Sequence, residues 1–296
     1  MNEHAARFTT LRPLLFTIAY EILGSATESD DVLQDSYLRW AEVDLSTVRD
    51  TKSYLAQLVT RQALNALRAG ARRREDYVGP WLPEPLLVTE PDASTDVVLA
   101  ESVSMAMLVV LETLGPDERA VFVLREVFGF DYDEIAGAVG KSVAAVRQIS
   151  HRARAHVHAR RKRFDADAAT SGEVTARFLT AAATGDLDAL LTVLAPNVTW
   201  TADSDGKASA ARRPVSGAER VGRLVLGLMR GAEQFDARFD LAVYNNAPAL
   251  VLYLGDSLEG VITIEVTDGQ ITHFYAMRNP EKLTGVLVAR EISRAI

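Results

Sequence analysis

The chain has 296 residues and a net charge of −8, and this length suits two or three domains better than a single core. It has no cysteine, which excludes disulfides, thiol redox chemistry and cysteine-ligated metal, and no apolar run of the roughly 20 residues that would cross a bilayer. The charged start, MNEHAARFTTLRP, is unlike a secretory signal, so we expect a cytoplasmic protein with no membrane segment, metal or other cofactor.

Positive charge is gathered in two places along the chain. Residues 61–74 contain five arginines and no acid, and residues 135–163 contain eight basic residues and no acid. The intervening residues 75–134 contain fourteen acids and two arginines, which leaves a charge of −12. Two basic islands around an acidic stretch can contact a phosphate backbone at two places and repel it between them. The alternative for either island is an ordinary solvated helix face.

Residues 1–76 are predicted to form an all-α unit. Apolar residues recur at helical spacing over residues 8–22. Ser25 and Glu28 have the spacing of a capping box and open a second helix, which is expected to continue to about residue 42. A third long helix is expected over residues 52–74. Its buried stripe consists of Tyr54, Leu55, Leu58, Leu64 and Leu67.

The segment that follows is rich in proline and acid. It reads YVGPWLPEPLLVTEPD, with four prolines between Pro80 and Pro91. Because proline is excluded from helix interiors and central strands, we expect an extended linker, assigned to residues 77–107. Helical spacing resumes near Asp96 and continues to about Phe164, so residues 108–165 are expected to form a second all-α unit.

A helix-turn-helix is predicted within residues 131–157. Such a unit needs a small residue where its helices cross, a glycine in the turn and an apolar anchor on the second helix, and Ala136, Gly140 and Val146 have this spacing. The solvent face of the second helix carries residues that suit contacts with base edges and phosphates. They are Ser142, which also caps the helix, Ala144, Arg147, Gln148, His151 and Arg152. The alternative is an αα-hairpin with no DNA-binding role.

The pattern changes after residue 172. Three helices are expected at 173–184, 187–194 and 217–231, followed by alternating strands at 237–244, 249–254, 258–267 and 270–277. Thr267-Asp-Gly-Gln270 is typical of a two-residue hairpin turn. Residues 172–290 are therefore predicted to be an α+β domain with one sheet curled around helices.

Two segments carry a resemblance to the extracytoplasmic-function (ECF) group of sigma-70 RNA polymerase sigma factors. The segment LETLGPDERAVFVLREVFGFDYDEIAGAVGKSVAAVRQISHRARAHV resembles their region 4, which implies that the helix-turn-helix binds the −35 promoter element. The segment DVLQDSYLRW, residues 31–40, resembles region 2.2, which implies a contact with the coiled coil of the polymerase β′ subunit. That contact would use Asp31, Gln34, Asp35 and Leu38. The alternative for these four is a solvated helix face.

The helix over residues 54–74 resembles regions 2.3 and 2.4 of the same family, which melt and read the −10 element. Arginine can neutralise phosphates or stack on unpaired bases, and asparagine can read an extruded base. The resemblance therefore implies a −10 contact through Arg61, Asn65, Arg68, Arg72, Arg73 and Arg74.

Three further motifs resemble the sigma-J-like subgroup, whose members carry a C-terminal SnoaL-like (NTF2-like) domain of cone-shaped α+β fold. The linker stretch 77–86 resembles the subgroup's signature, NPEKL at 279–283 resembles its NPDKL motif, and residues 203–207 keep part of its DGGGK motif. The resemblance implies that this domain modulates activity in place of a separate anti-sigma factor. The expected regulatory contacts are Trp81, Pro83, Glu84, Pro85, Asp203, Gly206, Lys207, Asn279, Pro280, Glu281, Lys282 and Leu283.

Cone-shaped domains of this kind enclose a pocket. Trp200, Tyr253, His273 and Tyr275 are the candidates to line it, with Asp203 as a further candidate for proton transfer. His273 and Tyr275 alternate along one strand, so they share a sheet face and are expected to point inward together. A small-molecule ligand is a candidate partner of this pocket. Fold alone does not transfer activity, so we expect a regulatory domain without catalysis.

The resulting hypothesis is a multidomain protein with two all-α sigma domains and one α+β domain. It would bind core RNA polymerase through the β′ and β subunits, recognise promoter DNA, and be monomeric when free. One alternative is a SnoaL-like isomerase or cyclase that carries a DNA-binding appendage. Another is a regulator of the LuxR type that uses the helix-turn-helix alone, which leaves residues 26–76 unexplained.

Overall fold

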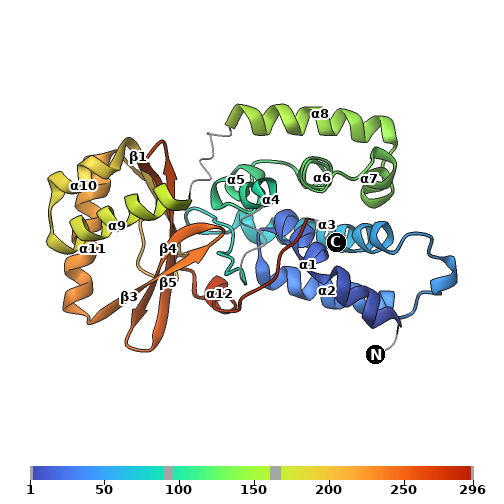
Figure 1. Cartoon of the computed structure of the whole chain (residues 1–296), viewed down its shortest axis with the longest axis horizontal. Helices are drawn as coiled ribbons and strands as arrows, with labels where there is room; N and C mark the ends of the chain where they lie inside the picture. Colours follow the sequence, from blue (N-terminus) through green and yellow to red (C-terminus); the bar gives the residue numbers. More distant parts are fainter. Residues whose placement is uncertain (1–2, 90–95, 161–167, 295–296) are drawn as a thin grey trace.

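The structure is a computed structural model that describes residues 3–89, 96–160 and 168–294. The molecule is elongated, with helices α1–α8 at one end and the sheet with its covering helices at the other (Figure 1). The chain returns at its C-terminus to the helical end, where it contacts α1. In the described residues, no helix is both long enough and apolar enough to cross a membrane.

The first helical unit contains α1 (Glu3–Leu23), α2 (Ala26–Trp40), a 3-10 turn (Leu45–Thr47) and α3 (Thr51–Glu75). The three predicted helices are confirmed, although α2 ends two residues before the expected position. Ser25 caps α2, and its side chain accepts from the backbone N–H of Glu28. Within the predicted stripe of α3, Leu55 is fully buried whereas Tyr54 is 38% exposed.

The second helical unit contains α4 (Val97–Ser102), α5 (Met105–Leu111), α6 (Pro116–Phe122), a π-helical turn (Val123–Val127), α7 (Tyr132–Val139) and α8 (Val143–Arg160). The predicted turn is confirmed, because Gly140 ends α7 with a φ of +69°, a left-handed conformation that favours glycine. Ser142 accepts from the backbone N–H of Ala145 and so caps α8. Both helical units contribute to one continuous apolar core, so they pack as a single body.

An acidic side chain is buried where the two helical units meet. Glu21 of α1 is fully buried, and its Oε1 accepts a hydrogen bond of 2.7 Å from the Ser102 hydroxyl. Its Oε2 is buried with no hydrogen-bond partner in the described part of the chain. Burial raises the pKa of Glu21 to about 8, against weaker opposing effects of Ser102 and Arg119. The side chain is therefore largely a neutral acid at pH 7.

We expect the protein to lose stability as the pH rises, and Glu21→Gln to remove part of this loss. The pKa of Glu21 is about 8 in the folded protein and about 4.5 in the unfolded chain. The stabilisation that the protonated side chain gives is therefore complete below about pH 4.5 and is lost as the pH rises through about 8. The loss is at most about 1.4 kcal/mol per pH unit between these values. Urea unfolding at pH 6 and pH 8.5 measures it, and an equal pH dependence in both proteins contradicts the prediction.

The C-terminal part contains a six-stranded sheet with the order β2-β1-β6-β5-β4-β3. The strands are β1 (Leu194–Asp203), β2 (Val215–Ser216), β3 (Ala237–Tyr244), β4 (Ala247–Leu254), β5 (Ser257–Thr267) and β6 (Gln270–Met277). The four predicted strands are confirmed as β3–β6, whereas β1 and β2 were not anticipated. β1 pairs with β6 in parallel and the remaining neighbours are antiparallel. Asp268 and Gly269 have φ of 50° and 71°, the backbone of the predicted hairpin turn.

The two faces of this sheet have different neighbours. Helices α9 (Ala168–Thr184), α10 (Leu187–Val193) and α11 (Ala218–Gln234) cover one face and form a core with it. The other face packs on the linker, on α5 and on the short α12 (Pro280–Leu283). The sheet thus stands between its own helices and the helical end of the molecule (Figure 1). The predicted α+β cone-shaped domain is confirmed.

Candidate functional site

The solvent face of α8 carries all six residues predicted to contact DNA. Ser142, Ala144, Arg147, Gln148, His151 and Arg152 are exposed, while Val146, Ile149 and Ala153 on the opposite face are buried. Arg152 forms a 3.5 Å ion pair with Glu118, and the guanidinium of Arg147 lies 5.5 Å from the ring centre of Tyr132. Both the ion pair and the cation–π contact are at the surface, where such contacts contribute about 1 kcal/mol or less, so these side chains remain available to a partner.

Helix α2 presents a second exposed surface. Asp31, Gln34, Asp35 and Leu38 are all exposed along one side of this helix. Leu38 is 59% exposed, while Val32, Leu33 and Trp40 on the other side are buried in the core. An exposed leucine at the end of a stripe of two acids and an amide is a suitable contact for a basic partner helix.

The basic face of α3 is turned toward the helix-turn-helix. Arg61 donates a 2.6 Å hydrogen bond to the carbonyl of Gly137 in α7. Arg68 forms a 2.6 Å ion pair with Asp117, which also holds Lys141 at 2.9 Å. Burial alone would raise the pKa of Asp117, but Lys141 and Arg68 hold that pKa below its ordinary value.

The other predicted −10 residues are Asn65 and three arginines near the end of α3. Asn65 is exposed on α3. The side chains of Arg72, Arg73 and Arg74 lie outside the described residues, so the structure places only their helical backbone.

A buried lysine joins the C-terminal domain to the linker. Lys282 in α12 donates to Asp203 Oδ2 (2.8 Å) and to the carbonyl of Leu82 (2.7 Å). Its ammonium nitrogen lies 3.2 Å from the ring centre of Trp81. We call Tyr77, Trp81, Asp203, Asn279 and Lys282 the Lys282 cluster.

The carboxylate of the Lys282 cluster is fully enclosed. Asp203 is 0% exposed, and it accepts from the backbone N–H of Leu82 at 2.7 Å and from the Tyr77 hydroxyl. That hydroxyl in turn accepts from the Asn279 amide at 2.7 Å. Burial raises the pKa of Tyr77 and lowers that of Lys282, although Asp203 opposes the second shift. Asp203 and Lys282 thus stabilise each other's charged form, because burying either charge alone would cost several kcal/mol.

The remaining predicted regulatory residues lie around this cluster. Lys207 bridges Asp205 and Glu281, each at 2.8 Å, and Gly206 takes a φ of +67° beside Val78. Glu84 accepts from the Ser25 hydroxyl at 2.7 Å and from the backbone N–H of Thr27 at 3.0 Å, so it adds to the cap of α2. Pro83, Pro85 and Leu283 are buried, whereas Pro280 is exposed at the start of α12.

A second buried junction was not predicted. Asn245, in the turn between β3 and β4, is fully buried and has a φ of 52°. Its amide donates to the Tyr20 hydroxyl and to the carbonyl of Val103, both at 2.8 Å, and its side-chain oxygen accepts from the N–H of Leu86 at 2.9 Å. One side chain therefore links α1, the linker, the loop before α5 and the sheet.

The C-terminal segment forms a third junction. Arg290 pairs with Asp30 of α2 at 2.8 Å, and Arg294 pairs with Asp96 at 2.7 Å. The N–H of Ser293 donates to the hydroxyl of Thr17 in α1 at 3.0 Å. This segment crosses from α12 to the helical end in Figure 1, and Asp30 lies next to the exposed stripe of α2.

Comparisons with known proteins match both helical units and the chain as a whole. Residues 7–73 match the family model for sigma-70 region 2, and residues 104–157 match the model for sigma-70 region 4. The chain is 37% identical to the ECF RNA polymerase sigma factor SigJ of Mycobacterium tuberculosis, over 95% of this chain and 93% of that one. The chain belongs to the ECF sigma factors.

Two further similarities extend over the whole of this sigma factor. It is 30% identical to the probable ECF sigma factor SigI of M. tuberculosis, over 96% of this chain and 97% of that one. It also matches the crystal structure of M. tuberculosis SigJ with a TM-score of 0.76 and 35% identity, over 96% of this chain and 99% of that one. The C-terminal domain is therefore part of the shared architecture.

The cavity in the C-terminal domain of this sigma factor is lined by only one of the four residues predicted for it. A cavity of about 520 Å³ lies between the sheet and its covering helices, and Trp200 lines it as predicted. Tyr253, His273 and Tyr275 do not line it, so their assignment to the pocket is wrong. His273 and Tyr275 do share a face and stack on each other, but Tyr275 packs in the core shared with the linker and donates to Glu265. Tyr253 instead stacks under Arg238.

Proposed function

We propose that this sigma factor binds core RNA polymerase through the exposed stripe of α2 and reads the two promoter elements with α3 and α8. We further propose that the free chain is a closed form, held together by its C-terminal domain. The observation that carries this proposal is the engagement of Arg61 and Arg68, two of the predicted −10 contacts, by α7 and α6 of the second helical unit.

Geometry supports the view that this form must open on a promoter. The −10 and −35 elements are centred about 25 base pairs apart, which is roughly 85 Å of duplex at 3.4 Å per pair. Arg61 of α3 lies within 2.6 Å of α7, and a single core covers both helical units. Units in such contact cannot occupy two sites that far apart, so promoter binding requires α3 and α7 to separate.

The C-terminal domain is suited to favour the closed form. It contacts the linker through the Lys282 cluster, both helical units through Asn245, and α2 and α4 through its last residues. Because the domain is tethered to the same chain, even weak contacts act at a high effective concentration. We propose that it regulates the sigma domains in place of a separate anti-sigma factor.

The same domain is proposed to act by contact and not by catalysis. The residues that line the cavity in the described part of the chain include no Asp, Glu or His. Asp203, the candidate for proton transfer, is directed instead to Lys282 and the linker. The groups on which general acid–base chemistry depends are thus outside the cavity.

Reconstitution of the full chain with core RNA polymerase tests the proposal. We expect Leu38→Asp to reduce holoenzyme formation at least tenfold, because it places a charge at the one apolar residue of the α2 stripe. Folding should be unchanged, since Leu38 is 59% exposed. Leu241→Asp is the matched control, because Leu241 is 64% exposed on β3 of the C-terminal domain.

Native gel shift measures the binding of the chain to core enzyme, and promoter-dependent run-off transcription measures the choice of a start site. Holoenzyme formation that is equally strong in the Leu38→Asp variant contradicts the α2 contact. A wild-type chain that joins core enzyme without selecting a start site contradicts the proposed promoter reading.

A further inference from the structure

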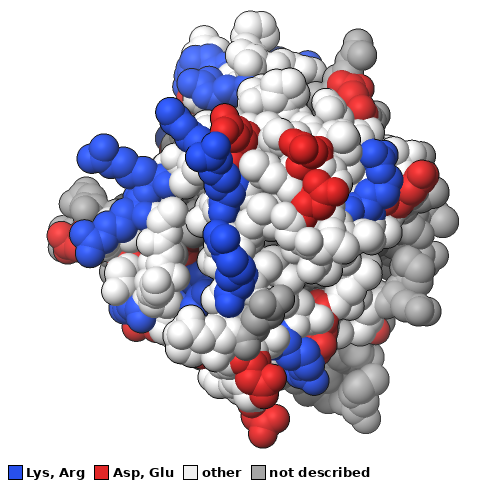
Figure 2. Space-filling model, turned by 90° about the vertical axis from the view of Figure 1, so that its left-hand side faces the viewer, with Lys and Arg blue, Asp and Glu red and all other residues white. Residues whose placement is uncertain are grey.

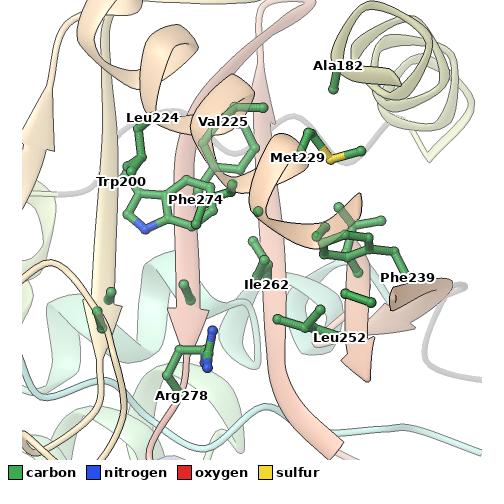
Figure 3. Close-up of a pocket in the computed structure, with 18 of the residues that line it drawn as sticks. Ala182, Trp200, Leu224, Val225, Met229, Phe239, Leu252, Ile262, Phe274 and Arg278 are labelled. Atoms are coloured by element: carbon green, nitrogen blue, oxygen red, sulfur yellow. The ribbon is translucent and has the colours of Figure 1, made fainter. Parts of the chain in front are cut away.

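The cavity of the C-terminal domain is apolar except at one end. Its volume of about 520 Å³ is within the usual range for small-molecule sites, about 300–1,000 Å³. Aromatic and aliphatic side chains from the sheet and from α9 and α11 form its walls, among them Trp200, Phe239 and Phe274. Figure 3 shows Arg278 at one end of this cavity, and Leu224 and Ala182 at the other.

Arg278 is the only charged residue among the described residues that line the cavity. Its Nη2 lies 3.2 Å from Glu259 Oε2, while its Nε is buried with no hydrogen-bond partner among the described residues. Gly260 makes room for it, because a Cβ at that position would lie 2.8 Å from Arg278 Cδ and 2.9 Å from the carbonyl of Met277. The backbone thus leaves space for a cation at the cavity end, with a donor that has no partner.

We propose that this cavity binds an apolar anion, a ligand with a hydrophobic body and a single acidic group that pairs with Arg278. Burial of the body against the apolar walls would supply most of the affinity. The acidic group would accept charge-assisted hydrogen bonds from the guanidinium of Arg278, which pairs with a single carboxylate, Glu259, among the described residues. A neutral ligand of the same shape could form at most an uncharged, weaker hydrogen bond there, and a cation would be repelled by the guanidinium.

The surface around the cavity is suited to attract such a ligand. Leu228 and Phe235 of the cavity lining are 41% and 67% exposed, so the cavity opens beside α11. This helix carries the exposed Arg220, Arg223 and Arg230. Figure 2 shows a row of Lys and Arg side chains crossing the end of the molecule that contains the C-terminal domain. A positive surface of this kind increases the rate at which anions arrive.

The cavity wall is continuous with the Lys282 cluster. Ala202 lines the cavity and the next residue, Asp203, binds Lys282. Arg278 lines the cavity and the next residue, Asn279, binds Tyr77. The backbone N–H of Arg278 also donates to the carbonyl of Asp203 at 2.7 Å. A ligand that moves Arg278 would therefore reach the linker contact directly, a consequence that rests on the proposed regulatory role of the domain.

Calorimetric titration of the full chain with dodecanoate, below its critical micelle concentration, tests the site. Dodecan-1-ol is the neutral control and should bind at least tenfold more weakly. Arg278→Gln should weaken dodecanoate about tenfold or more, whereas Glu259→Gln should strengthen it, because Glu259 no longer competes for the guanidinium. Arg238→Gln is the matched control, since Arg238 stacks on Tyr253 away from the cavity.

Two results would overturn the proposed site. One is dodecanoate binding that is absent, or that is the same in wild type, Arg278→Gln and Glu259→Gln. The other is unchanged binding by Ala276→Phe, which fills the cavity from β6. Hydrogen exchange of residues 77–89 with and without dodecanoate tests the link to the linker separately. Binding without any change in exchange refutes that link and leaves the site intact.

Discussion

Asp203→Ala is expected to weaken the docking of the C-terminal domain on the linker by about 3–5 kcal/mol, the usual cost of removing one partner of a buried ion pair. Lys282, which is 7% exposed in the wild type, would keep the carbonyl of Leu82 and the rings of Trp81 and Tyr77 as neighbours but would lose its paired carboxylate. The N–H of Leu82 and the Tyr77 hydroxyl would lose their acceptor as well. Hydrogen exchange of the linker should accelerate by on the order of a hundredfold or more.

The consequence for function follows from the proposed closed form. If the C-terminal domain favours that form, its release should raise the affinity of the free chain for promoter DNA. Fluorescence anisotropy with a labelled promoter fragment measures this at one fixed salt concentration, because salt alone changes such affinities. Faster linker exchange without tighter DNA binding would show that the Lys282 cluster docks the domain but does not restrain the promoter-reading helices.

Two further variants test whether the effect comes from the Asp203–Lys282 ion pair itself. Glu219→Ala is the matched control, because Glu219 pairs with Arg223 at the surface of α11, on the sheet face away from the linker. Such a surface pair contributes at most about 1 kcal/mol, so linker exchange should hardly change. Asp203→Leu combined with Lys282→Met removes both charges and should recover much of the loss. A double variant as unstable as the sum of the single ones would show that the two charges do not act as a pair.

The sequence was most informative where one face of an element is buried and the other is in water. The helix-turn-helix is an example, because Ala136, Gly140 and Val146 are fixed by a short local geometry and Gly140 alone sets the turn. Strands β5 and β6 were found by another local signal, since Thr267-Asp-Gly-Gln270 predicted the hairpin turn that Asp268 and Gly269 form between them. Local patterns of this kind need no knowledge of the rest of the chain.

The orientation of the sheet could not be predicted by the same reasoning. Alternation correctly placed His273 and Tyr275 on one face, but it does not say which face encloses the cavity. Both faces of this sheet are covered, one by α9–α11 and the other by the linker and α5, so neither has a polar pattern that marks it as outer. Phe274, Ala276 and Arg278, the alternate residues of β6 and its end, line the cavity instead.

The junctions between domains were predicted only where a motif marked them. The NPEKL motif and the partly kept DGGGK motif led to Lys282 and Asp203, although nothing in either motif shows that they meet. Asn245 carries no such signal, because Asn245-Asn246 reads as an ordinary turn. Its contacts with Tyr20 and Val103 join positions 225 and 142 residues apart. Contacts at such separations depend on how whole domains pack and not on local spacing.

The second large effect is expected when a covalent tether joins α3 to α7 and holds the chain in its closed form. The ideal Cβ of Gly137 would lie 3.3 Å from the side-chain amide of Gln57, so α3 and α7 approach closely at these residues. The chain has no cysteine, so Gln57→Cys combined with Gly137→Cys supplies the only two thiols. We expect a short, cleavable thiol-reactive linker between them to abolish promoter-dependent transcription. Cleavage of the linker should restore it.

The physical reason is that the tether holds Arg61 and Arg68 against the second helical unit while the two promoter elements lie roughly 85 Å apart. A loss of at least tenfold is expected in run-off transcription, and thermal unfolding should show that the tethered protein remains folded. The matched control is a tether between Glu126→Cys and Arg154→Cys. Glu126 and Arg154 form a 2.6 Å ion pair inside the second helical unit, which needs no opening.

The tether also distinguishes a requirement for opening from a requirement for polymerase binding. The α2 stripe is exposed in the closed form, so tethered protein should still join core enzyme and fail only at the promoter step. Failure at both steps would place the opening before polymerase binding. Tethered protein that transcribes as well as the cleaved form would show that α3 and α7 need not separate, and the closed form would then have no part in regulation.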